Sequence, residues 1–260
     1  MTAAAVDATL GELLSPSQVN TFLSCPAKWY FRYALGLAEP PTGTLALGTA
    51  FHSVLAANFR QKIETKQDLP AQGLEESFGE AFAMAAEDAE FRDDEEPATL
   101  IETGRALVRR YMADAAPWIQ PKAVELPVEG VIAGVRVHGI VDLLDREGRI
   151  IDCKTAARRP AGITPDYHLQ LTTYSMITPG ASGSCRLDTV TKTKTVQLVQ
   201  QAYTVGAQDI GAVEVMYPLV RDGIAGGLYF PNRQSFSCSR RNCAYWRDCE
   251  REFGGTIEAG

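Results

Sequence analysis

The sequence predicts an α/β protein with a helical N-terminal part, a mixed α/β middle and a cysteine-rich C-terminal segment. Three observations support this class. Helix-like apolar periodicity dominates the chain up to about residue 116, and short runs rich in β-branched residues begin near Lys122. Three of the six cysteines crowd into residues 238–249. We therefore expect one integrated domain with three parts, residues 1–121, 122–230 and 231–260.

Helical periodicity covers four stretches of the first part: residues 16–35, 48–63, 73–91 and 98–116. Ser15 and Pro16 suit a helix start, because serine caps the first turn and proline fits its first position. Phe51, Leu55 and Phe59 fall four apart and form the apolar stripe of an amphipathic helix. These stretches predict helices before the first strand.

Two short runs, residues 135–145 and 149–155, are dense in aliphatic and β-branched residues and are separated by a turn-forming Arg-Glu-Gly. This pattern predicts a β-hairpin. The chain then reads as a helix over residues 164–177, a strand over residues 185–199 and a final helix over residues 210–224.

The predicted hairpin contains three charged residues, Asp142, Asp152 and Lys154. Alternate residues of a strand share a face, so Asp152 and Lys154 point one way and Cys153 the other. The neighbours indicate strands with little exposed surface: Ile140, Val141, Leu143, Leu144, Ile150 and Ile151. An unpaired carboxylate is costly there, which favours a bound cation over the ordinary alternatives of exposed positions or a simple ion pair.

Composition limits the class of protein. With 260 residues and 45% hydrophobic content the chain can bury a substantial core. It has no apolar run long enough to span a bilayer and no secretion signal, so we expect a soluble, cytoplasmic protein without a membrane partner. The net charge of -7 does not exclude a nucleic acid, because residues 87–96 alone carry seven acids and one arginine. That acidic run is most simply a solvated loop or helix end.

The six cysteines fall into two groups. Cys153 and Cys185 lie in predicted strands and are expected to be buried apolar residues. In a chain without a secretion signal, the remaining four favour metal or cluster ligation: Cys25, Cys238, Cys243 and Cys249. Spacing alone does not separate a four-cysteine zinc site from an iron-sulfur cluster, or exclude unrelated free thiols.

In order along the chain, these motifs resemble the RecB-like branch of the PD-(D/E)XK nuclease superfamily, especially its iron-sulfur members, which include the AddB nuclease domain and CRISPR-associated RecB-like exonucleases. The matching pieces are a Ser-x-x-x-x-Phe-x-x-Cys-Pro helix with Cys25, GTAFH with His52, GIVD with Asp142, DCK with Asp152 and Lys154, QLTTY with Gln170 and Tyr174, and the terminal cysteines. The resemblance covers nearly the whole chain.

The resemblance implies a restriction-endonuclease-like core, a mixed central sheet flanked by helices. It implies that Asp142, Asp152, His52 and the Cys153 carbonyl hold Mg²⁺ or Mn²⁺. Lys154 would orient or deprotonate a water molecule or stabilise negative charge, while Gln170 and Tyr174 would position the lysine and the DNA. Cys25, Cys238, Cys243 and Cys249 would hold an iron-sulfur cluster of the [4Fe-4S] type.

The function expected from this resemblance is a metal-dependent DNA exonuclease acting on single strands or DNA ends in recombination, repair or phage DNA processing. Four basic residues are candidate phosphate contacts, with solvated side chains as the alternative: Lys192, Lys194, Arg240 and Arg241. The sequence lacks a G-x-x-x-x-G-K-[ST] loop, so any helicase or ATPase would be a separate partner. The partners that the resemblance implies, besides DNA, are a separate helicase, a recombinase or a CRISPR integrase. The alternatives are a non-catalytic DNA-binding or scaffold subunit with this fold and a zinc-binding structural module.

Overall fold

The computed structural model describes residues 11–259, and these residues divide into two packed units. Unit 1 comprises the described residues through Glu39, residues 129–139 and the described residues from Ala207 onward. Unit 2 comprises Pro40–Val128 and Ile140–Gly206. The charged hairpin motif and His52 lie in unit 2, whereas the four candidate cluster cysteines lie in unit 1. The boundaries after residues 121 and 230 stay a prediction.

Unit 2 begins with three helices, α3 (Gly43–Thr65), α4 (Ala71–Ala85) and α5 (Pro97–Asp114). Thr42 caps α3 through its side-chain oxygen, which accepts a hydrogen bond from Leu45 N. All three helices were expected, but the helix predicted over residues 73–91 ends at Ala85. The acidic run that follows is a loop, and it is not simply solvated: the Glu95 carboxylate accepts hydrogen bonds from Gly43 N and Thr44 N at the start of α3.

The sheet is mixed, as expected for this α/β class. Its strands are β2 (Pro121–Ile132), β3 (Val135–Asp145), β4 (Ile150–Ala156), β5 (Ser184–Thr191) and β6 (Leu198–Thr204). The predicted hairpin is confirmed, because β3 and β4 pair antiparallel with Leu144 opposite Ile150. β4 and β5 pair parallel, β5 and β6 antiparallel, and β2 pairs with β3. The helix predicted over residues 164–177 is confirmed as α6 (Pro165–Ile177), and it makes the crossover between the parallel strands.

The single strand predicted over residues 185–199 is wrong, because the chain reverses after β5 and returns as β6. The alternating Thr-Lys-Thr-Lys-Thr sequence runs through the point where the chain reverses. Because this alternation is typical of a strand, the sequence gives no sign of the turn. Threonine hydroxyls close the loop: Thr191 accepts a hydrogen bond from Gln197 N, and Thr193 donates to Thr195 O. The predicted strand is therefore two antiparallel strands.

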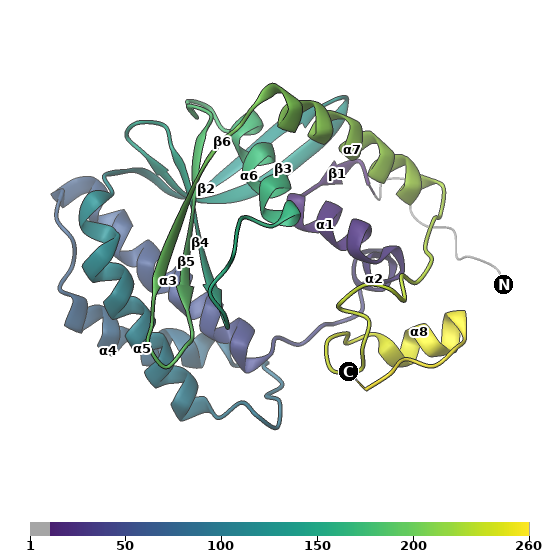
Figure 1. Cartoon of the computed structure of the whole chain (residues 1–260), viewed down its shortest axis with the longest axis horizontal. Coiled ribbons are helices and arrows are strands. Elements are labelled where there is room, and N and C mark those ends of the chain that lie inside the picture. Colours follow the sequence, from purple (N-terminus) through teal and green to yellow (C-terminus); the bar gives the residue numbers. More distant parts are fainter. Residues whose placement is uncertain (1–10, 260) are drawn as a thin grey trace. The chain divides into compact units, whose positions relative to one another are not determined.

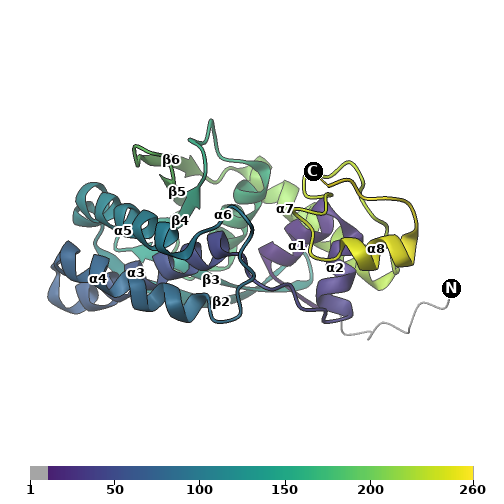
Figure 2. The same cartoon turned by 90° about the horizontal axis from the view of Figure 1, so that it is seen from below.

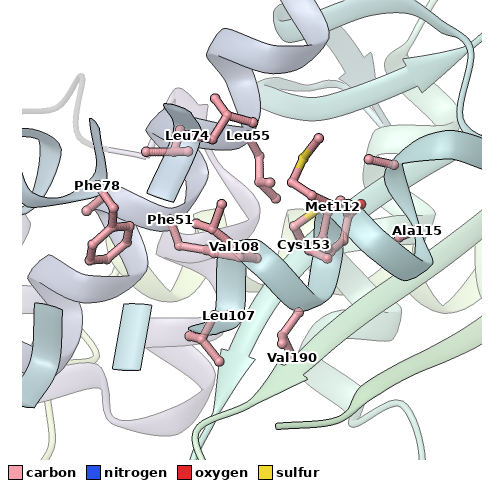
Figure 3. Packing of buried hydrophobic residues seen from close by; sticks show 14 of the residues in the cluster. Phe51, Leu55, Leu74, Phe78, Leu107, Val108, Met112, Ala115, Cys153 and Val190 are labelled. Atoms are coloured by element: carbon pink, nitrogen blue, oxygen red, sulfur yellow. Dashed lines mark hydrogen bonds between the residues drawn. The ribbon is translucent and has the colours of Figure 1, made fainter. Parts of the chain in front are cut away.

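The core of unit 2 lies between the three helices and one face of the sheet. Phe51 and Phe59 of α3 and Tyr111 of α5 pack with Ile151 and Cys153 of β4 in one buried cluster. Figures 1 and 2 show α3, α4 and α5 bundled beside β4 and β5, and Figure 3 shows Cys153 and Val190 among helix side chains. This packing directs the even-numbered residues of β4 away from the helices.

Unit 1 contains the chain's described ends. Its elements are β1 (Leu13–Leu14), α1 (Pro16–Ser24), α2 (Pro26–Trp29), a short π-helix (Tyr30–Ala34), α7 (Ala207–Ala225) and α8 (Trp246–Phe253). Ser15 caps α1 by accepting from Gln18 N, and α7 covers the predicted final helix. Strand β1, which pairs parallel with the first residues of β3, and helix α8 were not predicted. Among residues 11–259 the structure has no helix with the length and apolar character to cross a bilayer.

Candidate active site

Asp142 and His52 form the first half of the site. Asp142 lies on β3, and its Oδ2 accepts a hydrogen bond from Cys153 N at 2.9 Å, which ties the carboxylate to the middle of β4. His52 projects from α3 with its Nδ1 3.3 Å from the same Asp142 oxygen. Both side chains keep partial exposure, so the two groups are fixed yet reachable from solvent.

Asp152 and Lys154 form the second half. They lie two residues apart on β4, and Asp152 Oδ2 is 2.6 Å from Lys154 Nζ. On α6, Gln170 Nε2 donates to Asp152 Oδ1 at 3.1 Å and to the Tyr174 hydroxyl at 3.4 Å. The Asp152 carboxylate is thus held by a lysine on its own strand and by an amide from the crossover helix.

The prediction about strand faces is confirmed, with one exception. Cys153 packs in the helix core while Asp152 and Lys154 pair on the other face of β4, and Asp152 is only 2% exposed. Cys185 is also buried, as expected. Ile140, however, is 58% exposed, so β3 has an open face near Asp142 where the apolar sequence indicated burial.

Burial controls the protonation of this face. Burial raises the pKa of Asp152 to about 6; the Lys154 ammonium acts to lower it, and the Asp142 carboxylate raises it further. For Lys154, burial acts to lower the pKa, but Asp152 and Asp142 outweigh burial and raise it above its ordinary value. The two shifts describe one coupled pair, in which the lysine is an ammonium ion and the carboxyl is the group that titrates near neutrality.

The donor set fits a divalent cation in chemistry. Asp142, its neighbour His52 and Asp152 lie around the backbone of Cys153. Asp152 Oδ2 is buried and contacts Lys154 Nζ, but it accepts no hydrogen bond of good geometry. Oxygen ligands with one imidazole suit Mg²⁺ or Mn²⁺. No group of three or more His, Cys, Asp or Glu side chains within residues 11–259 is, however, already arranged as a metal site.

An open groove of about 760 Å³ runs past this site. Lys154 and His52 lie on its wall, and the remaining lining residues are Thr42, Thr44, Leu45, Gly48, Thr49, Ser53, Arg92, Glu125, Thr155 and Lys192. Glu125 also borders a small cavity with His52 and Asp142, and it has a left-handed backbone with φ of 44° inside β2. Strained non-glycine residues are frequent at functional sites. Sequence reasoning missed both Glu125 and the groove, because neither has a motif.

Tyr167 is a further site residue that the sequence did not single out. The Lys154 ammonium lies 5.5 Å from the centre of its ring, and burial raises the pKa of the Tyr167 hydroxyl. A cation above an aromatic face gains electrostatic attraction. Tyr167 precedes Gln170 by three residues on α6, so helical spacing from Gln170 and Tyr174 was the available signal.

The four candidate phosphate contacts differ in their surroundings. Lys192 lines the groove, whereas Lys194 is exposed and is not among the groove residues. Arg240 in unit 1 lies over the Trp246 ring and pairs with Glu250 at 3.4 Å. Arg241 is exposed, and its backbone N–H donates to Ala259 O. Within unit 2, the structure therefore brings Lys192, and not Lys194, to the groove beside the candidate active site.

The four cysteines of unit 1 surround one cavity. Cys25, Cys238, Cys243 and Cys249 line it together with Phe31 and Tyr245. All four are free thiols, and burial raises the pKa of Cys243 and that of Cys249, the latter to about 11. Four convergent thiols are a suitable donor set for zinc or an iron-sulfur cluster. As they stand they are not arranged as a metal site.

Comparisons with known proteins bear on the family and the fold of the chain. The family model described as "PD-(D/E)XK nuclease superfamily" matches residues 13–250. The crystal structure of a "Putative exonuclease" from Eubacterium rectale aligns with a TM-score of 0.56 at 12% identity, covering 97% of this chain and 94% of that chain. The crystal structure of SSO0001 aligns with a TM-score of 0.38 at 13% identity, covering 92% and 94%. No curated protein matches the sequence. The first structural likeness shows a common fold, and the second carries no weight.

Proposed function

Since the chain belongs to the PD-(D/E)XK nuclease superfamily, we propose that it is a divalent-metal-dependent DNA exonuclease of the RecB-like branch. Its substrates would be single strands or DNA ends in recombination, repair or phage DNA processing. A helicase, recombinase or CRISPR integrase would be a separate partner. The Eubacterium rectale protein, described as an exonuclease and similar in fold, supports the exonuclease assignment.

The proposal rests on one observation within unit 2: His52 contacts the Asp142 carboxylate, Lys154 contacts the Asp152 carboxylate, and the histidine and the lysine both line an open groove. Asp142 comes from β3, Asp152 and Lys154 from β4, and His52 from α3. The Asp142 contact with Cys153 N fixes the two strands in register at this point. A structural ion pair alone would need neither His52 nor the groove.

The proposed chemistry is hydrolysis of a phosphodiester bond. Asp142, Asp152, His52 and the Cys153 carbonyl would hold Mg²⁺ or Mn²⁺, which would neutralise the scissile phosphate and lower the pKa of a bound water. Lys154, whose pKa the two carboxylates hold high, serves as an ammonium that stabilises negative charge developing on the phosphate. Gln170 holds the Asp152 carboxylate in position from α6, and the Tyr174 hydroxyl in turn accepts a hydrogen bond from Gln170.

The test compares Lys154→Ala with wild type on end-labelled linear DNA and on closed circular single-stranded DNA, in Mg²⁺, in Mn²⁺ and in chelator. We expect wild type to shorten linear DNA, to spare circles and to stop in chelator, while Lys154→Ala loses cleavage and keeps its fold. Lys194→Ala is the matched control, because this lysine is exposed and lies outside the groove lining.

Other outcomes have definite meanings. Cutting of circles would replace the exonuclease by an endonuclease, and substantial activity in Lys154→Ala would refute the site assignment. Tight DNA binding without cleavage under any metal would favour the non-catalytic DNA-binding subunit.

We further propose that Cys25, Cys238, Cys243 and Cys249 hold a [4Fe-4S] cluster. Cys25 and the other three are more than two hundred residues apart in sequence, yet they line one cavity of unit 1. A shared cluster would therefore close a long loop of the chain. Closing this loop lowers the entropy of the unfolded state, so the cluster would act as a stabilising cross-link. Hydrolysis requires no electron transfer, so a stabilising role is sufficient.

A further inference from the structure

We propose that the groove beside Lys154 binds the sugar-phosphate backbone of the scissile strand through Lys192, independently of base sequence. This inference rests on the proposed nuclease function and deepens it by naming a substrate contact. It concerns only unit 2, in which the groove, Lys154 and Lys192 all lie.

The position of Lys192 follows from the strand register. β4 and β5 are parallel, with Lys154 opposite Thr189 and Ala156 opposite Thr191. Lys192 is the next residue, and its backbone N–H donates to Ala156 O at 2.7 Å. The lysine is thereby held at the carboxyl end of the catalytic strand pair, where open α/β sheets bind their ligands.

The Lys192 ammonium has no ion pair or hydrogen bond to another residue in the described part of the chain. Burial lowers its pKa, which Glu95 partly offsets, although the Glu95 carboxylate is already used by Gly43 N and Thr44 N. A half-buried cation without a paired anion is costly unless an anion arrives with the ligand. Lys194, two residues further along the chain, is exposed, so water can solvate its charge and no bound anion is required.

The remaining lining includes hydroxyl groups that suit a phosphate backbone, and its one acidic residue, Glu125, is paired with Arg60. The hydroxyl groups of Ser53 and Thr155 line the groove and can donate hydrogen bonds to phosphate oxygens. The groove has no phenylalanine, tyrosine or tryptophan among its lining residues, and its one imidazole, His52, is held against Asp142, so the groove offers little aromatic surface on which a base can stack. Recognition there should depend on charge, not on sequence.

The test measures binding in chelator, where no cleavage occurs, by fluorescence anisotropy of labelled single-stranded oligonucleotides over a range of salt concentrations. Three probes are compared: a thymidine homopolymer, a mixed sequence and a strand containing abasic sites. For Lys192→Ala we expect weaker binding of all three probes, and a slope of log K against log salt that is smaller by about 0.7, the value for one phosphate contact on a single strand. Lys194→Ala, the matched control, should keep the wild-type slope.

A second readout separates this inference from the proposed catalysis. In Mg²⁺, Lys192→Ala should raise KM with kcat unchanged, because Lys192 makes no contact with Asp142, Asp152 or Lys154 that would alter the chemical step. Any one of three results would overturn the inference. These are an equal salt slope for Lys192→Ala and wild type, a loss of affinity confined to one base sequence, and no DNA binding by wild type. If DNA binding shows the expected salt slopes but wild type cleaves no DNA, only the proposed nuclease activity is overturned.

Discussion

Two buried tyrosines on opposite sides of β4 should respond differently to loss of their hydroxyl groups. Tyr111 of α5 lies in the helix core, where its hydroxyl donates to Asp188 Oδ2 at 3.0 Å and contacts Cys153 Sγ at 3.2 Å. Tyr174 of α6 lies on the active-site side, where its hydroxyl accepts from Gln170 Nε2 at 3.4 Å. Tyr111→Phe should lower stability, and Tyr174→Phe should mainly lower activity.

The stability change for Tyr111→Phe follows from its acceptor. Asp188 is fully buried and is held by Arg186 through two 2.7 Å contacts and by Gln200 at 3.2 Å. A hydrogen bond to such a charged group contributes about 1.5–3 kcal/mol, because the carboxylate has no water to replace a lost donor. Burial raises the pKa of Tyr111 well above its ordinary value, so the hydroxyl is a donor at neutral pH.

The smaller stability change belongs to Tyr174→Phe. Its bond to Gln170 is neutral and long, so we expect a loss of about 0.5–1 kcal/mol. Gln170 also holds Asp152, and loosening a residue that positions a proposed metal ligand typically lowers activity by about tenfold or more. Tyr111→Phe should retain the wild-type kcat per folded molecule, since no Tyr111 contact reaches Asp142, Asp152 or Lys154.

The assay is urea unfolding of both variants in chelator, followed by cleavage of linear DNA under conditions where each variant is folded. Two results would refute the division of β4 into a core face and a catalytic face. One is a loss of kcat in Tyr111→Phe with unchanged stability, and the other is a large loss of stability in Tyr174→Phe with unchanged kcat.

Three further predictions follow from individual residues. In chelator, the stability of wild type relative to Asp152→Asn should fall by about 2 kcal/mol as the pH rises from 3.8 to about 6, because the native carboxyl keeps its proton after the unfolded chain has lost it; a flat difference in urea unfolding across this window would contradict the raised pKa. Gly48→Ala should raise stability by about 0.5–1 kcal/mol, since the added Cβ would meet only Thr155 Oγ1 at 3.8 Å, whereas Gly48→Leu should obstruct the groove and raise KM; equal KM values for the two variants would argue against substrate in the groove. Anaerobically purified protein should be brown with visible absorbance, and Cys249→Ala should lose both colour and thermal stability, whereas the buried-cysteine control Cys185→Ala should keep its colour; colourless protein with stoichiometric zinc would identify a zinc site instead.

The active-site strand was predictable because its signals are local. The period of a strand places Asp152 and Lys154 on one face and Cys153 on the other without knowledge of the neighbours. The spacing of four between Gln170 and Tyr174 likewise places both on one helix face, and the structure joins them by a hydrogen bond. Such predictions need only the geometry of one element.

Features that depend on two distant segments were not predictable in this way. Alternation through residues 192–197 concealed the reversal between β5 and β6, because threonine hydroxyl bonds, not a glycine or proline, close that loop. Lys192 and Lys194 have equal sequence signals, and only the register of β4 with β5 brings Lys192 to the groove. Glu95 read as one acid in a solvated run, yet its carboxylate satisfies the N-terminal amides of α3.

The core face of β4 also explains how the catalytic face can contain buried charge. Directly opposite Cys153 in the register lies Asp188, whose charge is cancelled by Arg186 on the same strand. The network behind β4 therefore adds no net charge, and it neither competes with Lys154 for Asp152 nor repels a cation held by Asp142 and Asp152. Removing one partner of such a pair would leave an unpaired buried charge at a cost of about 3–5 kcal/mol, whereas replacing both by apolar residues of similar volume can be nearly neutral. A neutral but polar core thus fixes the strand firmly while leaving the electrostatics of the active site to the residues on its other face.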